Sequence, residues 1–420
     1  MTIKKNNLLT SWLKSVHPQV WILAIGRLLS ALGSGLTLFY ATIFFVNRVG
    51  LSATSVGFAL GSASITGIAG RLLGGYLADS AWGRRRTLLL STIIAAVGAA
   101  MLGITNDFSA LVAANLVKGF GVGLYWPATE ALITDLTPMH QRREAFALTR
   151  LADNIGLGMG IIVAGWLVAQ TENYRLLFVV DAISFVILFA VIYVAITETR
   201  QAVIADRQNT PFLQSWKQAF SDRSLQIYAV VNIIFTTYIA QLHSTMPLFF
   251  NNFISVGVTA RGFSETTISS LFAWHLILTI LCQIPMVKGL QKYSHTKALK
   301  ISAGLWGMGF VVTWICGISE SNTLLWAICA LGIFALAIVS YTPSASSLVA
   351  DLAPESQRGV YLSINSLCWA VGYFIGPALG GWALDRTPAI VNNFWLGFGL
   401  SIAIAIFILH HLQGVLRERV

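Results

Sequence analysis

Charge is scarce in this chain of 420 residues: Asp, Glu, Lys and Arg make up 10% of it, against about 25% in an ordinary soluble domain. Hydrophobic residues make up 56%, and the mean hydropathy is +0.72. Since a membrane-spanning helix needs about 20 apolar residues, this content would supply roughly a dozen spans. The composition therefore excludes a soluble enzyme, a nucleic-acid-binding protein and a disordered chain.

Catalytic and cofactor motifs are also lacking. The sequence contains no P-loop, no GxSxG, no HExxH and no closely spaced Ser/His/Asp set, so we expect neither ATP-driven chemistry nor an enzyme active site. The four cysteines lie in or beside apolar runs without CxxC or metal-ligand spacing. We therefore predict a protein that is not an enzyme and that needs no metal or cofactor.

Long apolar runs dominate what is present, and they predict an all-α membrane protein with twelve transmembrane helices. The only long polar interruption, residues 198–225, divides these runs into two halves of six, at 1–197 and 226–420. The expected spans are about 20–46, 54–78, 87–105, 108–136, 144–170, 175–197, 226–254, 267–289, 299–318, 323–350, 357–384 and 393–413.

The distribution of basic residues predicts the orientation. With both termini and the 198–225 linker on the cytoplasmic side, 19 of the 27 Lys and Arg residues fall in cytoplasmic segments. Only Arg48, Arg175, Arg261 and Arg386 fall outside, and the remaining four lie within spans. This asymmetry agrees with the positive-inside rule for a multi-pass protein of a bacterial-type plasma membrane. The net charge of +10 is then explained by loops that face anionic lipid.

An internal repeat relates the two halves. A shift of 216 residues brings ten identical residues into one register across spans four and five and spans ten and eleven. The first copy contributes Tyr125, Pro127, Asp135, Leu136, Pro138, Gln141, Arg142, Gly160, Gly165 and Trp166. Their counterparts are Tyr341, Pro343, Asp351, Leu352, Pro354, Gln357, Arg358, Gly376, Gly381 and Trp382. Such a parallel duplication predicts pseudo-symmetric halves with a substrate path between them.

The loop after span two carries a recognisable motif. Gly75, Asp79 and Gly83 precede three consecutive arginines, Arg84, Arg85 and Arg86. This pattern resembles the loop signature of the major facilitator superfamily, with one additional residue between Asp79 and Gly83. The resemblance implies the major facilitator fold and a secondary transporter that works by alternating access. It also implies that this loop is a conformational latch, which holds one state of the transporter.

A second resemblance is to the bacterial drug–proton antiporter branch of that superfamily. Span four contains Lys118-Gly119-Phe120-Gly121-Val122-Gly123, which is similar to the family's intramembrane Arg/Gly motif with Lys in place of Arg. Span ten contains Tyr341-Thr342-Pro343-Ser344. Span five is rich in glycine, but Ile161 stands where the antiporter signature has proline. This likeness implies proton-coupled efflux of small amphiphilic compounds.

Ionisable residues within spans are costly and are candidates for function. Almost all of them lie in the first half: Arg27, Arg71, Lys118, Glu130, Arg150, Asp153 and Asp181. Arg27 shares one helical face with Ser30, Ser34 and Thr37. It could line a substrate cavity or extend to the cytoplasmic surface. Lys118 could bind an anionic group or a titrating carboxylate, or form a permanent salt bridge between helices.

Three residues are candidate proton carriers. Asp153 lies in an i, i+3, i+4 cluster with Arg150 and Asn154, whose members could also satisfy one another. Glu130 lies near Trp126 on the helical wheel and is a rival carboxylate. His243, which shares a face of span seven with Asn232, could titrate or could be a hydrogen-bonded core residue.

The substrate cavity is expected to be charged on one wall and aromatic on the other. Candidates from the first half are Arg27, Lys118, Tyr125, Trp126 and Arg150, and candidates from the second half are Asn232, Tyr238, His275 and Tyr341. The aromatic residues could equally be packing residues. The expected partners are a small-molecule substrate, protons as the coupling ion and membrane lipids. Translocation of a lipid or lipid precursor, or uptake of an organic anion, is the alternative; a polytopic enzyme or a receptor is disfavoured.

Overall fold

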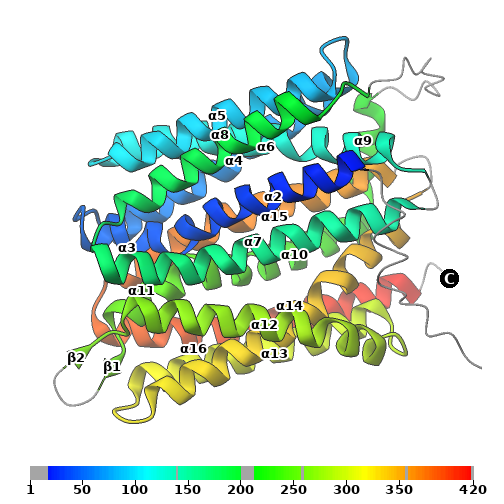
Figure 1. Ribbon diagram of the computed structural model, residues 1–420. Helices are drawn as coiled ribbons and strands as arrows, with labels where there is room; N and C mark the ends of the chain where they lie inside the picture. Colours follow the sequence, from blue (N-terminus) through cyan, green and yellow to red (C-terminus); the bar gives the residue numbers. More distant parts are fainter. Residues whose placement is uncertain (1–17, 139–140, 200–211, 257–259, 355–357, 418–420) are drawn as a thin grey trace, which may run out of the picture. The chain divides into compact units, whose positions relative to one another are not determined.

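The computed structural model describes residues 18–138, 141–199, 212–256, 260–354 and 358–417. Twelve segments in these ranges are long and apolar enough to cross a membrane, which confirms the predicted all-α membrane protein (Figure 1). The first and seventh spans each consist of two helices, because the helix breaks at Phe39 and at Ser244. A two-stranded hairpin, β1 (Ser255–Val256) with β2 (Ala260–Arg261), follows the seventh span.

The chain divides into two compact units. Unit 1 comprises residues 1–40 and 62–204, and unit 2 comprises residues 41–61 and 205–420. The helices of unit 1 are α2 (Pro18–Leu38), α5 (Arg84–Ile104), α6 (Phe108–Leu136), α7 (Arg142–Thr171) and α8 (Arg175–Ala195). Those of unit 2 are α3 (Tyr40–Asn47), α9 (Phe212–Ser221), α10 (Arg223–His243), α11 (Thr245–Asn252), α12 (Glu265–Leu290), α13 (His295–Ile318), α14 (Thr323–Leu352), α15 (Arg358–Leu384) and α16 (Pro388–Arg417). Helix α4 (Ala53–Asp79) runs through both units.

The division differs in detail from the halves expected at 198–225. The boundary in the linker falls at residues 204 and 205, but residues 41–61 of the first half belong to unit 2. Within the expected linker, α9 is a helix, and α10 begins at Arg223, where the Asp222 carboxylate accepts a hydrogen bond from the Ser224 amide at 2.9 Å. The polar segment 198–225 therefore contains an amphipathic helix, α9.

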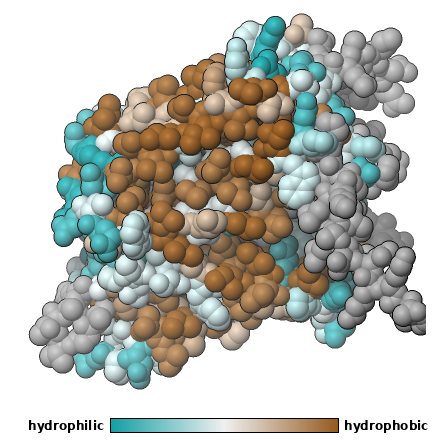
Figure 2. Space-filling view, viewed as in Figure 1, coloured by the Kyte–Doolittle hydropathy of each residue, from teal (hydrophilic) through white to brown (hydrophobic). Residues whose placement is uncertain are grey.

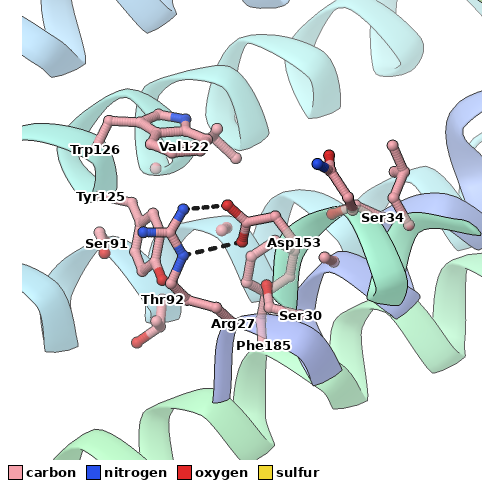
Figure 3. A pocket seen from close by; sticks show the side chains of 15 residues that line it. Arg27, Ser30, Ser34, Ser91, Thr92, Val122, Tyr125, Trp126, Asp153 and Phe185 are labelled. Carbon is pink, nitrogen blue, oxygen red and sulfur yellow. Dashed lines mark hydrogen bonds and ion pairs between the residues drawn. The ribbon is translucent and has the colours of Figure 1, made fainter. Parts of the chain in front are cut away.

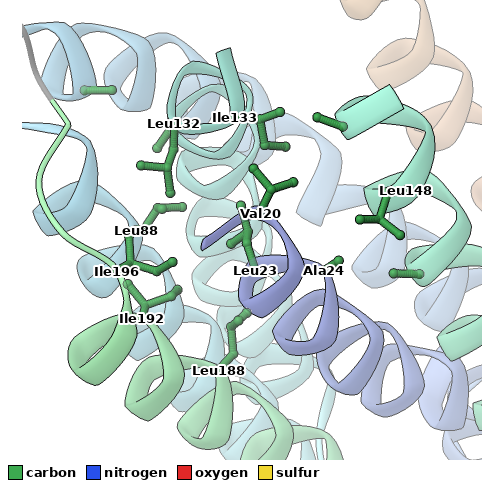
Figure 4. Packing of buried hydrophobic residues seen from close by; sticks show 14 residues of the cluster. Val20, Leu23, Ala24, Leu88, Leu132, Ile133, Leu148, Leu188, Ile192 and Ile196 are labelled. Atoms are coloured by element: carbon green, nitrogen blue, oxygen red, sulfur yellow. The ribbon is translucent and has the colours of Figure 1, made fainter. Parts of the chain in front are cut away.

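Unit 1 is held together by apolar packing and close helix contacts. Its core cluster draws on α2, α5, α6, α7 and α8, and includes Val20, Leu88, Leu132 and Leu188 (Figure 4). Helices α2 and α7 approach each other closely at two glycines, Gly35 and Gly160. A Cβ at Gly35 would lie 3.1 Å from the Gly160 Cα. Small residues at such crossings are how membrane helices gain van der Waals contact. Gly156 and Gly160 of span five are thus explained by packing, since a Cβ at either would lie within 2.2 Å of an α2 carbonyl oxygen.

Unit 2 repeats the helix pairs of unit 1. In unit 1 α2 packs on α7, α5 on α6, and α5 on α8; in unit 2 α10 packs on α15, α13 on α14, and α13 on α16. Its core is aromatic, with Trp306, Phe310 and Phe334 in mutual ring contact. The pairing follows the order expected from the 216-residue repeat.

The first turns of α4 pack against residues of unit 2. The Asp385 carboxylate accepts hydrogen bonds from the backbone amides of Ala53 at 2.9 Å and Thr54 at 2.8 Å. A carboxylate at a helix N-terminus satisfies amides that have no partner within the helix and interacts favourably with the helix dipole. A Cβ at Gly61 would lie 2.8 Å from the Phe374 carbonyl oxygen. This end of α4 therefore lies directly against α15.

The flanks of the helices are apolar where they are exposed. Residues such as Ile277, Leu281 and Ile284 of α12 are exposed large hydrophobics. Figure 2 shows hydrophobic residues over the middle of the visible face and hydrophilic residues gathered toward helix ends. An apolar flank of this kind is suited to contact with lipid acyl chains.

Candidate functional site

Unit 1 contains a cavity of about 240 Å³ among α2, α5, α6, α7 and α8. Its lining is mostly apolar, with Val122, Leu157 and Phe185 among the contributors (Figure 3). Four of the predicted site residues line it: Arg27, Tyr125, Trp126 and Asp153. A mostly apolar cavity with a few convergent polar groups is the usual form of a small-molecule site.

Arg27 of α2 and Asp153 of α7 form a two-point ion pair in this cavity. The Arg27 Nε donates to Asp153 Oδ1 at 2.9 Å, and a second hydrogen bond joins Nη2 to Oδ2. The arginine side chain is 3% exposed, whereas the aspartate side chain is 23% exposed. Arg27 therefore faces the cavity and does not extend to the surface. The carboxylate is the partner that a ligand or a proton can reach.

Trp126 of α6 lies close to two guanidinium groups. The Arg27 Cζ is 5.1 Å and the Arg150 Cζ 5.0 Å from the centre of its ring, within the range of cation–π attraction. Arg150 in turn lies 3.7 Å from Glu130. The cluster within span five is therefore not internally paired: Asp153 pairs with α2 and Arg150 with α6. Both pairs join different helices, which helical-wheel reasoning on a single span could not show.

A second ion pair is buried beyond the cavity. Lys118 Nζ of α6 donates to Asp181 Oδ2 of α8 at 2.5 Å. The aspartate side chain is 0% exposed and that of the lysine 17%. The Thr37 hydroxyl of α2 lies 3.4 Å from the same carboxylate oxygen and 3.5 Å from the Lys118 Nζ. The interhelical salt bridge foreseen for Lys118 is thus present, and its partner is Asp181.

The loop with the three arginines is ordered by acidic side chains. The Glu198 carboxylate accepts hydrogen bonds from the backbone amides of Arg84 at 2.9 Å and Arg85 at 3.1 Å, at the start of α5. Arg84 Nε also lies 2.9 Å from Asp135 Oδ2. Gly83 has a φ of +89°, which a residue with a side chain rarely adopts. Asp79 ends α4, and its side chain lies outside the described part of the chain.

The other arginines of this loop contact aromatic residues. Arg85 donates to the Tyr193 carbonyl oxygen at 2.6 Å and lies over the Tyr193 ring. The Arg86 Cζ is 6.0 Å from the Trp82 ring centre. Gly75 faces α6, where an added Cβ would be 4.0 Å from Pro127. These contacts hold the loop against unit 1.

The candidates from the second half are buried in the core of unit 2. Tyr341 donates to Asn232, whose amide donates to Asn365 at 2.9 Å. Tyr238 bonds Ser401 at 2.7 Å and contacts the Trp306 ring. The structure thus places these three residues in packed, hydrogen-bonded positions rather than in the unit 1 cavity.

Both histidine candidates have hydrogen-bond partners. His243 Nδ1 lies 2.8 Å from the Tyr373 hydroxyl, and His275 Nδ1 lies 2.9 Å from the Leu331 carbonyl oxygen. His275 is buried. These contacts are those of core histidines, and they bring neither residue to the cavity that holds Asp153.

Comparison with protein families identifies the fold. A family model described as Major Facilitator Superfamily matches residues 23–260 and 248–416, which together make up most of the chain. The chain belongs to this superfamily. It is accordingly a multi-pass membrane transporter and not an enzyme, and the resemblance drawn from the loop motif is confirmed.

Several relatives within the superfamily are named multidrug resistance protein MdtH. The one from Photorhabdus laumondii subsp. laumondii is 25% identical over 392 residues, covering 93% of this chain and 93% of the relative. The one from Salmonella newport is 24% identical over 382 residues, covering 90% of each. The similarity thus extends over both halves.

Solved structures of the superfamily share the fold. A nucleoside transporter, NupG, superposes with a TM-score of 0.79 at 15% identity, covering 94% of this chain and 99% of that structure. A D-xylose–proton symporter gives a TM-score of 0.72 at 18% identity, covering 93% and 96%. At these identities the comparison bears on architecture alone.

Sequence reasoning missed two parts of this site. Asp181 stands out in the sequence only as an ionisable residue in an apolar run, and nothing there marks it as the partner of Lys118. Ser91 and Thr92 of α5 and Phe185 of α8 also line the cavity. Small hydroxyl and aromatic side chains are common in buried helices, so no local pattern could have identified them.

Proposed function

We propose that this transporter exports small amphiphilic compounds across a bacterial-type plasma membrane in exchange for protons. The proposal includes two functional halves, 1–197 and 226–420, joined by a cytoplasmic linker at 198–225, and cytoplasmic termini. It rests above all on the Arg27–Asp153 pair, in which a partly accessible carboxylate faces an otherwise apolar cavity. The name of the MdtH relatives, multidrug resistance protein, supports the same function.

The ion pair supplies a means of coupling. A proton on Asp153 removes its negative charge and weakens its hold on Arg27, whereas an ionised Asp153 needs Arg27 or a cationic group nearby. Substrate and proton then compete for one carboxylate, so substrate binding from the cytoplasm releases a proton and proton binding from outside releases the substrate. Trp126 supplies an apolar and aromatic surface beside the carboxylate for a lipophilic ligand.

The geometry favours Asp153 over the other candidate carriers. Glu130 is 52% exposed and is paired with Arg150 outside the cavity lining. His243 is held by Tyr373 in unit 2. Asp153 is the candidate that combines a charged partner, an apolar surrounding and an accessible edge.

Uptake of an organic anion is less well supported. An anion site in unit 1 would need a cation able to turn toward the ligand. Arg27 and Lys118 each have an aspartate partner, and both are largely buried. Recognition of an anion would therefore require one of these pairs to break, leaving a buried carboxylate unpaired.

The proposed exchange is tested in everted membrane vesicles with an imposed pH gradient. We expect lipophilic cations or neutral amphiphiles to collapse the gradient in vesicles that contain the transporter. Matched vesicles without the transporter provide the control. If no compound in such a panel moves protons, the exporter function is wrong, and anions, sugars and lipid precursors become the compounds to test.

We further propose that Gly75, Asp79, Gly83, Arg84, Arg85 and Arg86 form a conformational latch. The order imposed on this loop by Glu198 and Asp135 supports a role that needs a defined loop shape. Asp79→Asn is expected to change the balance of inward- and outward-facing states, read as the accessibility of single cysteines on the two membrane sides. Lys292→Gln, in the corresponding loop of the second half, is the control. An unaltered accessibility pattern in Asp79→Asn would contradict this role.

A further inference from the structure

Two ion pairs of unit 1, Arg27–Asp153 and Lys118–Asp181, both contact one face of α2. Arg27 of the first pair and Thr37 at the second pair are ten residues apart, which corresponds to about 15 Å along a helix. Ser30 and Ser34 lie between them on the same face, and both line the cavity. A row of hydroxyl groups thus leads from the Arg27–Asp153 pair toward Lys118 and Asp181.

The cavity ends one helical turn short of the second pair on three helices. On α2 the lining reaches Ser34, and Thr37 donates to the Ser34 carbonyl oxygen at 3.2 Å. On α6 it reaches Gly121, three residues from Lys118, and on α8 it reaches Phe185, four residues from Asp181. Residues three or four apart on a helix are neighbours on its surface. The Lys118–Asp181 pair therefore lies about one turn beyond one end of the cavity.

One carboxylate oxygen of Asp181 has no hydrogen-bond partner among the described residues. Oδ2 bonds Lys118, but Oδ1 is buried and has no hydrogen-bond partner among the described residues. A buried carboxylate oxygen without a donor is costly, and a proton bound there would remove that cost. Gly33 of α2 faces this carboxylate and the Ser184 hydroxyl, since a Cβ there would lie 2.1 Å from Ser184 Oγ and 3.0 Å from Asp181 Oδ1.

Few charged groups lie near Asp181 in the described part of the chain. Lys118 from α6 is the charged group in contact with it, and Thr37 from α2 is the neighbouring hydroxyl. The helix α5, which also packs on α8, has no titratable side chain from Thr87 to Ile104. Arg27 is the one ionisable residue in α2 and is engaged by Asp153. A change in the protonation of Asp181 would thus act mainly on Lys118.

We propose that Asp181 is a second proton-carrying carboxylate, which exchanges a proton with Asp153 through the cavity along the hydroxyl face of α2. In the exchange, a proton passes between cavity water and Asp181 by way of the Thr37 hydroxyl, which lies 3.4 Å from Asp181 Oδ2, and water takes or gives one at Asp153 in return. One carboxylate gains a proton as the other loses one, and the water is unchanged. A cavity of about 240 Å³ has room for several water molecules.

This inference rests on the proposed proton exchange and adds a direction to it. In the proposed topology α2 starts at the cytoplasmic side, so Thr37 and Asp181 lie on the outer side of Asp153. A proton from outside would reach Asp181 first and Asp153 second. Lys118 would be released from Asp181 whenever a proton is bound there.

The first test measures protonation without transport. Infrared difference spectra of the purified transporter, recorded between high and low pH, should contain a carboxylic-acid band that is lost in Asp181→Asn. The same band should titrate at a different pH in Asp153→Asn, because the two carboxylates exchange protons. A spectrum that Asp181→Asn leaves unchanged would overturn the proposal, whether or not the transporter exports drugs.

The second test measures coupling in proteoliposomes. Asp181→Asn should lower efflux driven by a pH gradient by roughly tenfold or more, while substrate counterflow, which needs no net proton movement, stays within about twofold of wild type. Thr37→Val should slow gradient-driven efflux as well. Thr313→Val is the matched control, since the Thr313 hydroxyl is equally buried and bonds only the Gly309 carbonyl oxygen of its own helix in unit 2.

A further variant separates loss of function from loss of folding. The double variant Lys118→Met/Asp181→Asn removes both charges, so neither is left buried without a partner. It should be folded, lack the Asp181 band and fail to couple. Gradient-driven efflux at the wild-type rate in this variant or in Asp181→Asn would overturn the proposal. If the wild-type protein itself shows no such efflux, the proposed function fails, and the infrared experiment still decides the role of Asp181.

Discussion

Asp153→Asn is expected to abolish proton-coupled efflux and to leave the binding of a neutral substrate in place. The asparagine keeps the size of the side chain and can still accept one hydrogen bond from Arg27, but it cannot bind and release a proton. Gradient-driven efflux should fall by about a hundredfold or more, the range expected when a positioned proton-transfer group is removed. Affinity for a neutral amphiphile, measured by tryptophan fluorescence quenching, should change far less, because the apolar lining and Trp126 remain.

Two further variants test whether Asp153 itself, and not Glu130, carries the proton. Asp153→Glu keeps a titratable carboxyl group and should restore a measurable part of the coupled flux. Glu130→Gln removes the rival carboxylate, which is half-exposed and paired with Arg150, and should leave coupling near that of wild type. Normal pH-driven flux in Asp153→Asn, or its loss in Glu130→Gln alone, would show that Asp153 is not the carrier.

Lys118→Met is expected to cause the largest loss of stability. The substitution removes the charge but keeps the length of the side chain, so Asp181 remains buried with no cation. Breaking a buried ion pair on one side costs about 3–5 kcal/mol. The midpoint of thermal unfolding in detergent, followed by circular dichroism, should therefore fall clearly below that of wild type.

Neutralising both partners provides the matched comparison. Lys118→Met/Asp181→Asn should recover most of the lost stability, because replacing a buried pair by neutral residues of similar size is often close to neutral. Lys297→Met, at an exposed lysine that lies over the Tyr293 ring, should change stability by no more than about 0.5 kcal/mol. Equal unfolding midpoints for Lys118→Met and wild type would contradict a stabilising role of the pair.

The fold was largely predictable because the bilayer imposes a strong rule on the sequence. A span must carry about 20 apolar residues, so runs such as 175–197 could be identified without knowledge of packing. The breaks at Phe39 and Ser244 were not predicted. The break at Phe39 lies in an apolar run with no proline or charge beside it. Near Ser244 the polar residues Gln241 and Thr245 interrupt the run, and Pro247 stands in the first turn of α11, where proline is tolerated.

The site was predictable only as a set of residue types. Arg27, Lys118 and Asp153 could be selected because a charge in a membrane span is rare. Their partners could not, since pairing depends on which helix faces which. Arg150 and Asp153 are three residues apart, yet each pairs with a different helix. The second-half candidates were chosen on residue type and on position along a single span, and aromatic and amide side chains in helices serve packing as readily as binding.

The carboxylate cap on α4 bears on how the protein is made. The amides of Ala53 and Thr54 leave the ribosome early, whereas their partner Asp385 follows more than 300 residues later, at separations of 332 and 331 residues. Unit 2 contains residues 41–61 as well as everything after 204, so its assembly begins near the start of translation and is completed near its end. A gene divided at the linker would place residues 41–61 and Asp385 on separate polypeptides. Such fragments would complete unit 2 only after they associate, however well each inserts into the membrane by itself.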